Sequence, residues 1–507
     1  MLLTDTQLLS FQRCQRQAFL DVYGDRFQQD PKSDFLLKLI QDSLAFDSHF
    51  LENKIYHKPD YPRGDWKAGA EATLALMHRG VDLIYRGILQ MSYSCPQGEA
   101  KLVGRPRLLI KQPTPSRFWE WSYVPADLKL GKRPKAEYQL VAAFHAQILA
   151  SVQGTWPETA RLIFRQKNPF AVNLELRVPQ MEAALSELIE MLASKQEPEV
   201  FISRQKCNLC LWYSSCHSLA SSQQHLSLVP GVTPSRYAIL KALNLTALDS
   251  LAGVEPEILT IYPEFAGAIG DRVVLQARSL LENRPFFSWD LTIKQREFDR
   301  YPDPLPANSY LLPQLISAPV ELYFDIEAQP ENNLDYLHGV LVVDNRNKTQ
   351  KFKVMLAEKP AEEGAIWEQL LKLFWQYPIA PIYHFCEYET QTIKRLAKVY
   401  HTPAYRWQPL LKRCVDIHRL IRETATLPVE SYALKHIARW LGFDWRDENA
   451  NGAQSVCWYE QWLNTGDRSL LEAIVRYNED DCYATYSVKK WLESFLNKTL
   501  NSNHEKI

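Results

Sequence analysis

Short apolar runs alternate with stretches of helical period along the last part of the chain. Residues 321–328 read Glu-Leu-Tyr-Phe-Asp-Ile-Glu-Ala, the pattern of a buried strand. Similar runs predict further strands at 337–344, 351–356 and around Ile382. Helical periodicity predicts helices at 362–375, at 431–441 and around 477–485. We therefore expect an α/β domain over 319–496, followed by a polar tail at 497–507.

The beginning of the chain predicts a second α/β unit, over 1–222. A helical pattern covers 4–23 and ends at Gly24. An apolar strand pattern at 123–129 leads into a helical pattern at 136–152. This unit is therefore expected to have a core of its own.

The middle of the chain, residues 223–285, carries short helical patterns after a Pro-Gly turn. It resembles a helix-hairpin-helix module, whose loop amides bind phosphate at a helix N-terminus. A plain helical connector is the alternative. Frequent prolines at 286–318 predict an extended, semi-rigid linker.

Composition mainly excludes some classes of protein. The 507 residues are 46% hydrophobic and 23% charged, as in a globular protein with two or three domains. Because the net charge is −1, binding to a polyanion requires local basic patches. The sequence has no long uncharged apolar stretch, and its first residues lack a signal-peptide pattern. Nine thinly spread cysteines indicate a reducing compartment, so we expect a cytoplasmic protein without membrane contact.

The strand at 321–328 places two carboxylates on one face. Strand side chains alternate, so Asp325 and Glu327 point the same way. Adjacent carboxylates repel each other and lose hydration, which favours a compensating cation. The alternative is an ordinary polar strand edge.

Further acids follow in a fixed order. Glu389 opens a helix after the Ile382 strand, and Tyr477 and Asp481 lie four residues apart on the last helix. This order resembles the DEDD exonucleases of the RNase H-like superfamily, above all the RNase H-like domain that accompanies RecB-like nuclease domains in bacterial proteins. The resemblance implies that Asp325, Glu327, Glu389 and Asp481 bind two Mg²⁺ or Mn²⁺ ions, with Tyr477 beside the attacking water. In the wider superfamily the acid at the Glu389 position is usually Asp.

Four cysteines have metal-ligand spacing. Cys14 lies near the start of the chain, and Cys207, Cys210 and Cys216 form C-x2-C-x5-C. This pattern resembles the iron–sulfur nucleases of the RecB-like superfamily, which implies a [4Fe–4S] cluster joining the two ends of the nuclease domain. The alternatives are a structural Zn²⁺ on the same four thiolates and, less in keeping with the spacing, plain buried thiols. Either metal would be structural, since four protein ligands leave no open position.

Between these cysteines, Asp127-Leu-Lys129 and the helix that follows it resemble the PD-(D/E)XK pattern of nucleases. The resemblance implies that Asp127 binds a metal ion and that Lys129 orients the attacking water. Gln139 matches the glutamine of the next helix in that family. His49 lies where these nucleases carry an early histidine ligand; a core or surface histidine is the alternative.

One departure affects this second site. The family carries G-x-P-D before the acid-x-Lys strand, whereas this chain has Gly104-Arg105-Pro106-Arg107. An arginine in place of a ligand repels a cation, so we expect the fold to be kept and cleavage there to be weakened or lost. The basic residues around it can follow a phosphate backbone, or can form a solvated face. They are Arg105, Arg107, Lys129, Lys132, Arg133 and Lys135.

Together these patterns predict a multidomain α/β protein. It would have an N-terminal restriction-endonuclease-like α/β domain, a helical middle and a C-terminal RNase H-like α/β domain. The expected function is metal-dependent hydrolysis of phosphodiester bonds in DNA or RNA, with the main site in the C-terminal domain. By resemblance the enzyme is an exonuclease, and its substrate is nucleic acid, DNA in the first place, with single-stranded ends; no protein partner is indicated. The alternative is a non-catalytic nucleic-acid-binding or scaffold protein with decayed nuclease sites.

Overall fold

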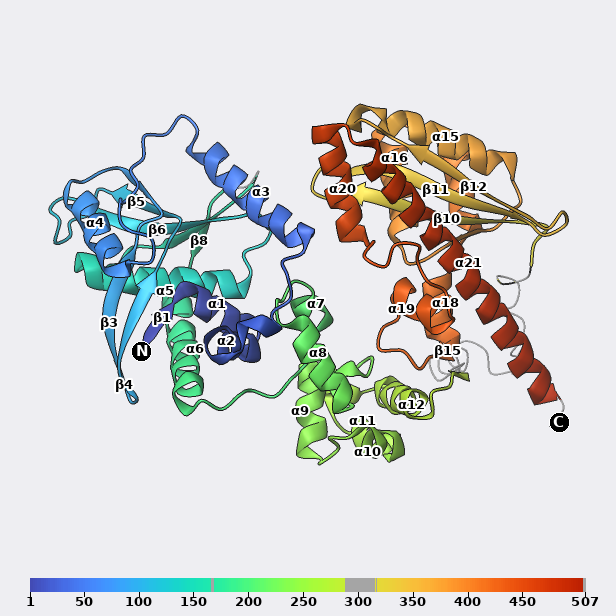
Figure 1. Cartoon of the computed structure of the whole chain (residues 1–507), viewed down its shortest axis with the longest axis horizontal. Helices are drawn as coiled ribbons and strands as arrows, with labels where there is room; N and C mark the ends of the chain where they lie inside the picture. The colour runs from blue at the N-terminus through green and yellow to red at the C-terminus, as the bar shows by residue number, and fades with distance from the viewer. Residues whose placement is uncertain (166–167, 288–314, 316, 505–507) are drawn as a thin grey trace. The chain divides into compact units, whose positions relative to one another are not determined.

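The computed structural model describes residues 1–165, 168–287, 315 and 317–504, and these form two compact units. Unit 1 is Met1–Leu219 and unit 2 is Ala220–Ile507 (Figure 1). Most of the linker expected at 286–318 lies outside the described residues. No helix among the described residues is long and apolar enough to cross a membrane.

Unit 1 is built on a five-stranded sheet with strand order β2-β5-β6-β7-β8. Its strands are Leu83–Tyr85, Leu108–Gln112, Ser122–Lys129, Ala160–Phe164 and Phe170–Val172. Only β6 and β7 are parallel, and α5 (Ala136–Gln153) connects them. The expected strand and helix at 123–129 and 136–152 are thus confirmed. Most of α5 is buried, which explains why its sequence is apolar on nearly every side.

A smaller sheet and several helices complete unit 1. The sheet has strand order β1-β4-β3, from Leu2–Thr4, Gly98–Gly104 and Leu89–Cys95. The helices are α1 (Asp5–Arg13), α2 (Gln15–Tyr23), α3 (Asp34–Leu51), α4 (Trp66–His78), α6 (Leu174–Ser194), α7 (Arg204–Cys207) and α8 (Tyr213–Ser222).

The single helix predicted at 4–23 is wrong. Cys14 has an extended backbone, with φ of −160°, and separates α1 from α2. Its sulfur accepts a hydrogen bond from Gln17 N, so Cys14 also caps α2. The helical period continues across the break, which is why the sequence pattern concealed it.

The helical middle consists of α9 (Pro234–Ala242), α10 (Leu248–Gly253), α11 (Pro256–Thr260) and α12 (Ile269–Glu282). Thr233 caps α9 through its side chain, and Pro234 occupies the first turn, where its missing N–H costs nothing. Gly231 has a φ of +97°, which the Pro-Gly turn requires.

The sheet of unit 2 has strand order β12-β11-β10-β13-β14. Its strands are Thr349–Leu356, Leu334–Asp344, Val320–Gln329, Ile382–His384 and Cys414–Asp416. The first three form an antiparallel meander, and β10, β13 and β14 are parallel. The strands predicted at 321–328, 337–344, 351–356 and around Ile382 are confirmed.

In the described part of unit 2, seven α-helices follow β12 along the chain. They are α15 (Glu363–Gln376), α16 (Tyr388–Val399), α17 (Ala404–Arg413), α18 (Ile417–Thr424), α19 (Leu434–Trp440), α20 (Gly452–Thr465) and α21 (Arg468–His504). The helix predicted at 431–441 starts later than expected, at Leu434. The Ser431 hydroxyl accepts a hydrogen bond from Ala433 N instead of capping a helix, a local bond that competes with helical structure.

Alternate side chains of β10 point into two different hydrophobic cores. Leu322 and Phe324 point into the core that includes α15, whereas Tyr323 points into the core that includes α18, α19 and α21. Since side chains alternate along a strand, Asp325 and Glu327 share the face of Tyr323. They therefore face α21, the helix that crosses this side of the sheet (Figure 1).

A fully buried ion pair fixes α21 against β10. Lys489 Nζ lies 2.9 Å from Glu321 Oε1, and both side chains are completely buried. The Tyr323 hydroxyl donates to the other oxygen of Glu321 at 2.7 Å. Asp481 lies two i, i+4 steps before Lys489, on the same face of α21. The pair thus determines which face of α21 meets the acids of β10.

Candidate functional site

Three carboxylates of unit 2 converge. Asp325 and Glu327 from β10 and Asp481 from α21 each offer one oxygen, and these oxygens all lie within 4.8 Å of one another. Among the described residues, these are the His, Cys, Asp or Glu side chains whose potential ligand atoms come close enough together to share a metal ion. Glu327 is buried and Asp325 is half-buried. Oxygen ligands at this spacing suit a hard divalent cation.

The protein environment makes these acids hard to ionise. Burial raises the pKa of Asp325 well above its ordinary value, and the neighbouring charges of Asp481 and Glu327 add to this effect. Burial likewise raises the pKa of Glu327. For Asp481, burial raises the pKa to about 7, although hydrogen bonds from Trp445 and Tyr477 oppose the shift. Three acids in such surroundings need a positive charge, and the site therefore fits a bound cation.

Neighbouring side chains hold the three acids in place. Asn478 Nδ2 donates to Asp325 Oδ2 at 2.6 Å, and Trp445 Nε1 donates to Asp481 Oδ1 at 2.7 Å. Ser455 and Asn478 hydrogen-bond to Glu327. Each carboxylate thus has a donor that fixes its orientation while its other lone pairs stay available.

Gly339 makes room for Asn478. It lies opposite Asp325 on β11, and a Cβ atom at this position would be 1.7 Å from Asn478 Oδ1. Asn478 itself is fully buried, so its amide cannot move into solvent. Only glycine at this position allows Asn478 to reach Asp325.

Tyr477 lies at the site as predicted. Its hydroxyl hydrogen-bonds to Asp481. Burial, followed by the charges of Asp481, Glu327 and Asp325, raises the pKa of Tyr477 well above its ordinary value. The phenol therefore stays protonated and acts as a hydrogen-bond donor.

Glu389 is beside the group but not within it. It is buried near the start of α16, and its charge contributes to the raised pKa of Asp325. His384 Nδ1 lies 3.5 Å from Glu389 Oε2, an oxygen that has no hydrogen-bond donor in the part of the chain that the structure describes. Cys386, between these two residues, has a left-handed backbone with φ of +79°. The structure thus brings three of the four predicted ligands together and places the fourth next to them.

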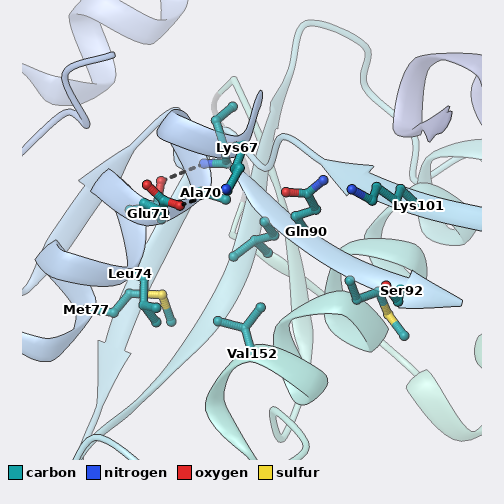
Figure 2. Close-up of a pocket in the computed structure, with 13 residues that line it drawn as sticks. Lys67, Ala70, Glu71, Leu74, Met77, Gln90, Ser92, Lys101 and Val152 are labelled. Carbon is teal, nitrogen blue, oxygen red and sulfur yellow. Dashed lines mark hydrogen bonds and ion pairs between the residues drawn. The ribbon is translucent and has the colours of Figure 1, made fainter. Parts of the chain in front are cut away.

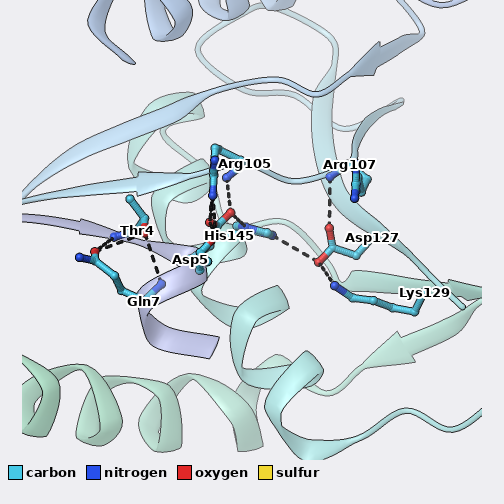
Figure 3. Close-up of polar contacts among 9 residues, drawn as sticks. Thr4, Asp5, Gln7, Arg105, Arg107, Asp127, Lys129 and His145 are labelled. Carbon is cyan, nitrogen blue, oxygen red and sulfur yellow. Dashed lines mark hydrogen bonds and ion pairs between the residues drawn. The ribbon is translucent and has the colours of Figure 1, made fainter. Parts of the chain in front are cut away.

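In unit 1, the predicted Asp127 and Lys129 lie together on β6, with Lys129 Nζ 3.3 Å from Asp127 Oδ2 (Figure 3). His145 Nδ1 is 3.8 Å from the same oxygen, and its Nε2 is 2.9 Å from Asp5 Oδ2. Asp5 in turn pairs with Arg105. The result is a continuous polar chain, of which the sequence analysis had identified Asp127, Lys129 and Arg105.

Two residues predicted for this site have other partners. Gln139 is buried, but its Nε2 donates to Pro134 O at 2.7 Å and its Oε1 accepts from Arg177. The His49 side chain is 81% exposed and lies 3.3 Å from Glu52, because its face of α3 points to solvent. The buried acid of α3 is Asp47, two residues earlier, which contacts Arg107 at 2.9 Å. The structure does not bring His49 to Asp127.

The remaining basic residues of the predicted cluster lie on an exposed loop after β6. Lys132, Arg133 and Lys135 are exposed. Lys135 Nζ lies 5.9 Å from the centre of the Tyr138 ring, and Lys129 Nζ lies 5.0 Å from it.

The four predicted cysteines gather at one place in unit 1. Cys14, Cys207, Cys210 and Cys216 line a single small pocket. Burial raises the pKa of Cys210 to about 12, and the neighbouring thiols add to the shift. Burial also raises the pKa of Cys207 and Cys216. These thiols would need a cation nearby to become thiolates.

A separate cleft of about 380 Å³ lies between α4 and β3 of unit 1 (Figure 2). Leu74, Met77 and Val152 form its apolar base, and Lys67 and Lys101 lie at its edge. None of the predicted site residues lines this cleft. It is therefore unrelated to either group of acids.

Several residues around the two groups were missed from the sequence. The sequence contains a local indication of Asn478, because this residue directly follows Tyr477 in the Tyr-x-x-x-Asp segment. Gly339 had a weaker one, as an isolated glycine within a strand. Trp445 and Asp47 had none, since long-range packing alone brings them to Asp481 and Arg107.

Residues 322–493 match the family model of the RNase_H superfamily. This match confirms the expected C-terminal RNase H-like domain, and it points to a nuclease-type function on nucleic acid. No curated protein matches this chain in sequence.

We expect the crowding of the acids to cost stability when no metal is present. The pKa of Asp481 is raised from 3.8 to about 7 by burial, so the folded state keeps a proton that the unfolded state has lost in this range. This difference in proton binding favours the folded state fully below pH 3.8, and the folded state loses that stabilisation as pH rises through about 7. In EDTA, Asp481→Asn should be more stable than wild type by roughly 4 kcal/mol at pH 8, and by only roughly 2 kcal/mol at pH 5. Urea unfolding at both pH values measures this, and a variant that is less stable at pH 8 would contradict it.

Gly339→Ala should displace the Asn478 amide from Asp325, since the added methyl overlaps Asn478 Oδ1. We expect unit 2 to lose about 1–3 kcal/mol, as is usual for overpacking, and to bind divalent cations more weakly. Thermal unfolding with and without Mn²⁺ gives both quantities. Gly442→Ala is the control, because a Cβ there meets no atom and only its left-handed backbone is strained. Unchanged Mn²⁺ stabilisation in Gly339→Ala would show that the Asn478 contact is dispensable.

Proposed function

We propose that this chain is a metal-dependent nuclease that hydrolyses phosphodiester bonds at single-stranded ends of nucleic acid, DNA in the first instance. The main active site is in the C-terminal domain. The observation that carries the proposal is the convergence of Asp325, Glu327 and Asp481 within 4.8 Å, inside residues that match the RNase_H superfamily.

The residues at this site suit such a reaction. Two divalent cations bound there would neutralise the charge on the attacking and leaving oxygens. Asp325, Glu327 and Asp481 would hold them, with Glu389 available through an oxygen that has no donor among the described residues. The protonated Tyr477 would donate a hydrogen bond to the incoming water or the scissile phosphate, next to Asp481.

In this proposal unit 1 binds nucleic acid and contributes little cleavage. Arg107 replaces the acidic ligand that the PD-(D/E)XK resemblance would require, and its guanidinium contacts Asp47. Lys129 would also repel a metal ion bound at Asp127, because its Nζ lies 3.3 Å from the Asp127 carboxylate.

We also propose that Cys14, Cys207, Cys210 and Cys216 hold a structural [4Fe–4S] cluster. Their common pocket supports metal binding. Four thiols in one pocket would suit a [4Fe–4S] cluster or a structural Zn²⁺ ion, and the cluster is proposed because the spacing of the cysteines in the sequence resembles that of iron–sulfur nucleases.

Cleavage of end-labelled single-stranded DNA and RNA in Mn²⁺ or Mg²⁺ tests the main proposal. Asp325→Asn should lower the rate at least about 100-fold, because a metal ligand contributes several kcal/mol to transition-state stabilisation. Glu472→Gln, an exposed acid on the same helix as Asp481, is the control and should cleave like wild type. The double variant Asp127→Asn/Lys129→Gln shows how much of the cleavage depends on the acid and lysine of unit 1.

The outcomes separate the alternatives. Loss of cleavage only in the double variant would place the chemistry in unit 1. A wild-type protein that binds nucleic acid but never cuts it would support the non-catalytic scaffold instead.

Protein purified without oxygen should be brown, with about four irons per chain if a single [4Fe–4S] cluster is present. Cys210→Ser should lose this colour and much of its iron, since one thiolate ligand is gone. Cys95→Ser, a cysteine outside the pocket, should keep both. Colourless wild-type protein with one zinc per chain would refute the cluster.

A further inference from the structure

Two arginines of unit 1 meet at one buried carboxylate. Arg107 Nη1 lies 2.9 Å from Asp47 Oδ2, and Arg86 Nη2 lies 3.3 Å from the same oxygen. The Tyr85 hydroxyl also donates to it, at 2.7 Å. The Asp47 side chain is 1% exposed, whereas those of Arg86 and Arg107 are 36% and 31% exposed. One buried charge thus holds two cations that still reach the surface.

The backbone also holds these arginines together. Arg86 has a left-handed backbone, with φ of +56°, which costs a non-glycine residue about 1 kcal/mol. Its N–H donates to Arg107 O at 2.9 Å. Arg107 N donates in turn to Asp127 Oδ1 at 3.1 Å. The two guanidinium groups are therefore fixed in position before any ligand binds.

Charge disfavours a divalent cation among these groups. Asp127 Oδ1 accepts a hydrogen bond from Arg107 N, and Asp47 Oδ2 accepts from three donors, whereas Asp127 Oδ2 and Asp47 Oδ1 have no hydrogen-bond donor among the described residues. Lys129 Nζ lies 3.3 Å from Asp127 Oδ2, so a cation at that oxygen would meet a positive charge. The guanidinium of Arg107 and the ammonium of Lys129 would repel the ion. Figure 3 shows Arg107, Asp127 and Lys129 at this place. The same donors and charges favour an anion.

The surroundings favour the phosphate of a nucleic-acid strand as that anion. The exposed loop after β6 adds Lys132, Arg133 and Lys135. Tyr138, with Lys129 and Lys135 near its ring, provides a half-buried aromatic side chain next to these charges. Basic groups beside an aromatic ring are typical of sites for single strands.

We infer that unit 1 binds a backbone phosphate of single-stranded nucleic acid without a metal ion, through Arg86, Arg107 and Lys129. The guanidinium of Arg107 supplies the positive charge that a metal supplies in a two-metal nuclease. The inference rests on the proposed function only for the identity of the ligand as nucleic acid. The full chain would thus hold a strand in unit 1 whether or not unit 2 contains metal.

Binding of labelled single-stranded DNA and RNA to the full chain in EDTA, measured by fluorescence anisotropy, tests this inference. Arg107→Gln and Arg86→Gln should each raise the Kd about ten-fold, as expected for loss of a charged hydrogen bond. Each should also make the slope of log K against log salt shallower by about 0.7, the value for one phosphate contact on a single strand. Arg79→Gln, an exposed arginine of unit 1, should change neither quantity.

A second variant guards against misfolding. Arg107→Gln leaves Asp47 with fewer donors, so Asp47→Asn/Arg107→Gln removes both charges and should unfold like wild type in urea. If this double variant binds as tightly as wild type, the inference is wrong. It is also wrong if wild type binds only when Mg²⁺ is added. Cleavage by unit 2 is scored separately: Arg107-dependent binding without any cleavage would refute the proposed nuclease but not this inference.

Discussion

Mutual repulsion among Asp325, Glu327 and Asp481 is the constraint around which unit 2 is organised. Three carboxylate oxygens within 4.8 Å of one another, in a poorly hydrated place, are unfavourable for an isolated fold. The rest of the domain keeps them there. Such an arrangement is best explained by a ligand that the acids bind, because the cost of holding them together is recovered only when a cation is present.

The elements that hold the acids come from distant parts of the sequence. β10 supplies two of them on one face, and α21 supplies the third. The buried pair of Lys489 and Glu321 fixes α21 against β10, so Asp481 faces the strand acids. Gly339 leaves space for Asn478 to reach Asp325. Packing and polar contacts thus fix the geometry before metal or substrate binds.

The sequence predicted those features that depend on local period. The spacing of Asp325 and Glu327 in a strand, and of Tyr477 and Asp481 in a helix, placed each pair on one face, and the structure agrees. Contacts between distant residues left no such trace. The pairing of Arg107 with Asp47, the position of Trp445 beside Asp481 and the break at Cys14 all depend on the folded chain. His49 shows the opposite error, since a position that matched a family motif turned out to face solvent.

The two units handle charge in opposite ways. Unit 2 gathers three acids at one place, whereas unit 1 has an arginine beside its acids. Counting bound Mn²⁺ by electron paramagnetic resonance at pH 8 tests this account most directly. The account predicts two Mn²⁺ ions per wild-type chain and loss of both in a chain that carries Asp325→Asn and Asp481→Asn. A wild-type chain that binds no Mn²⁺, or a double variant that still binds two, would contradict it.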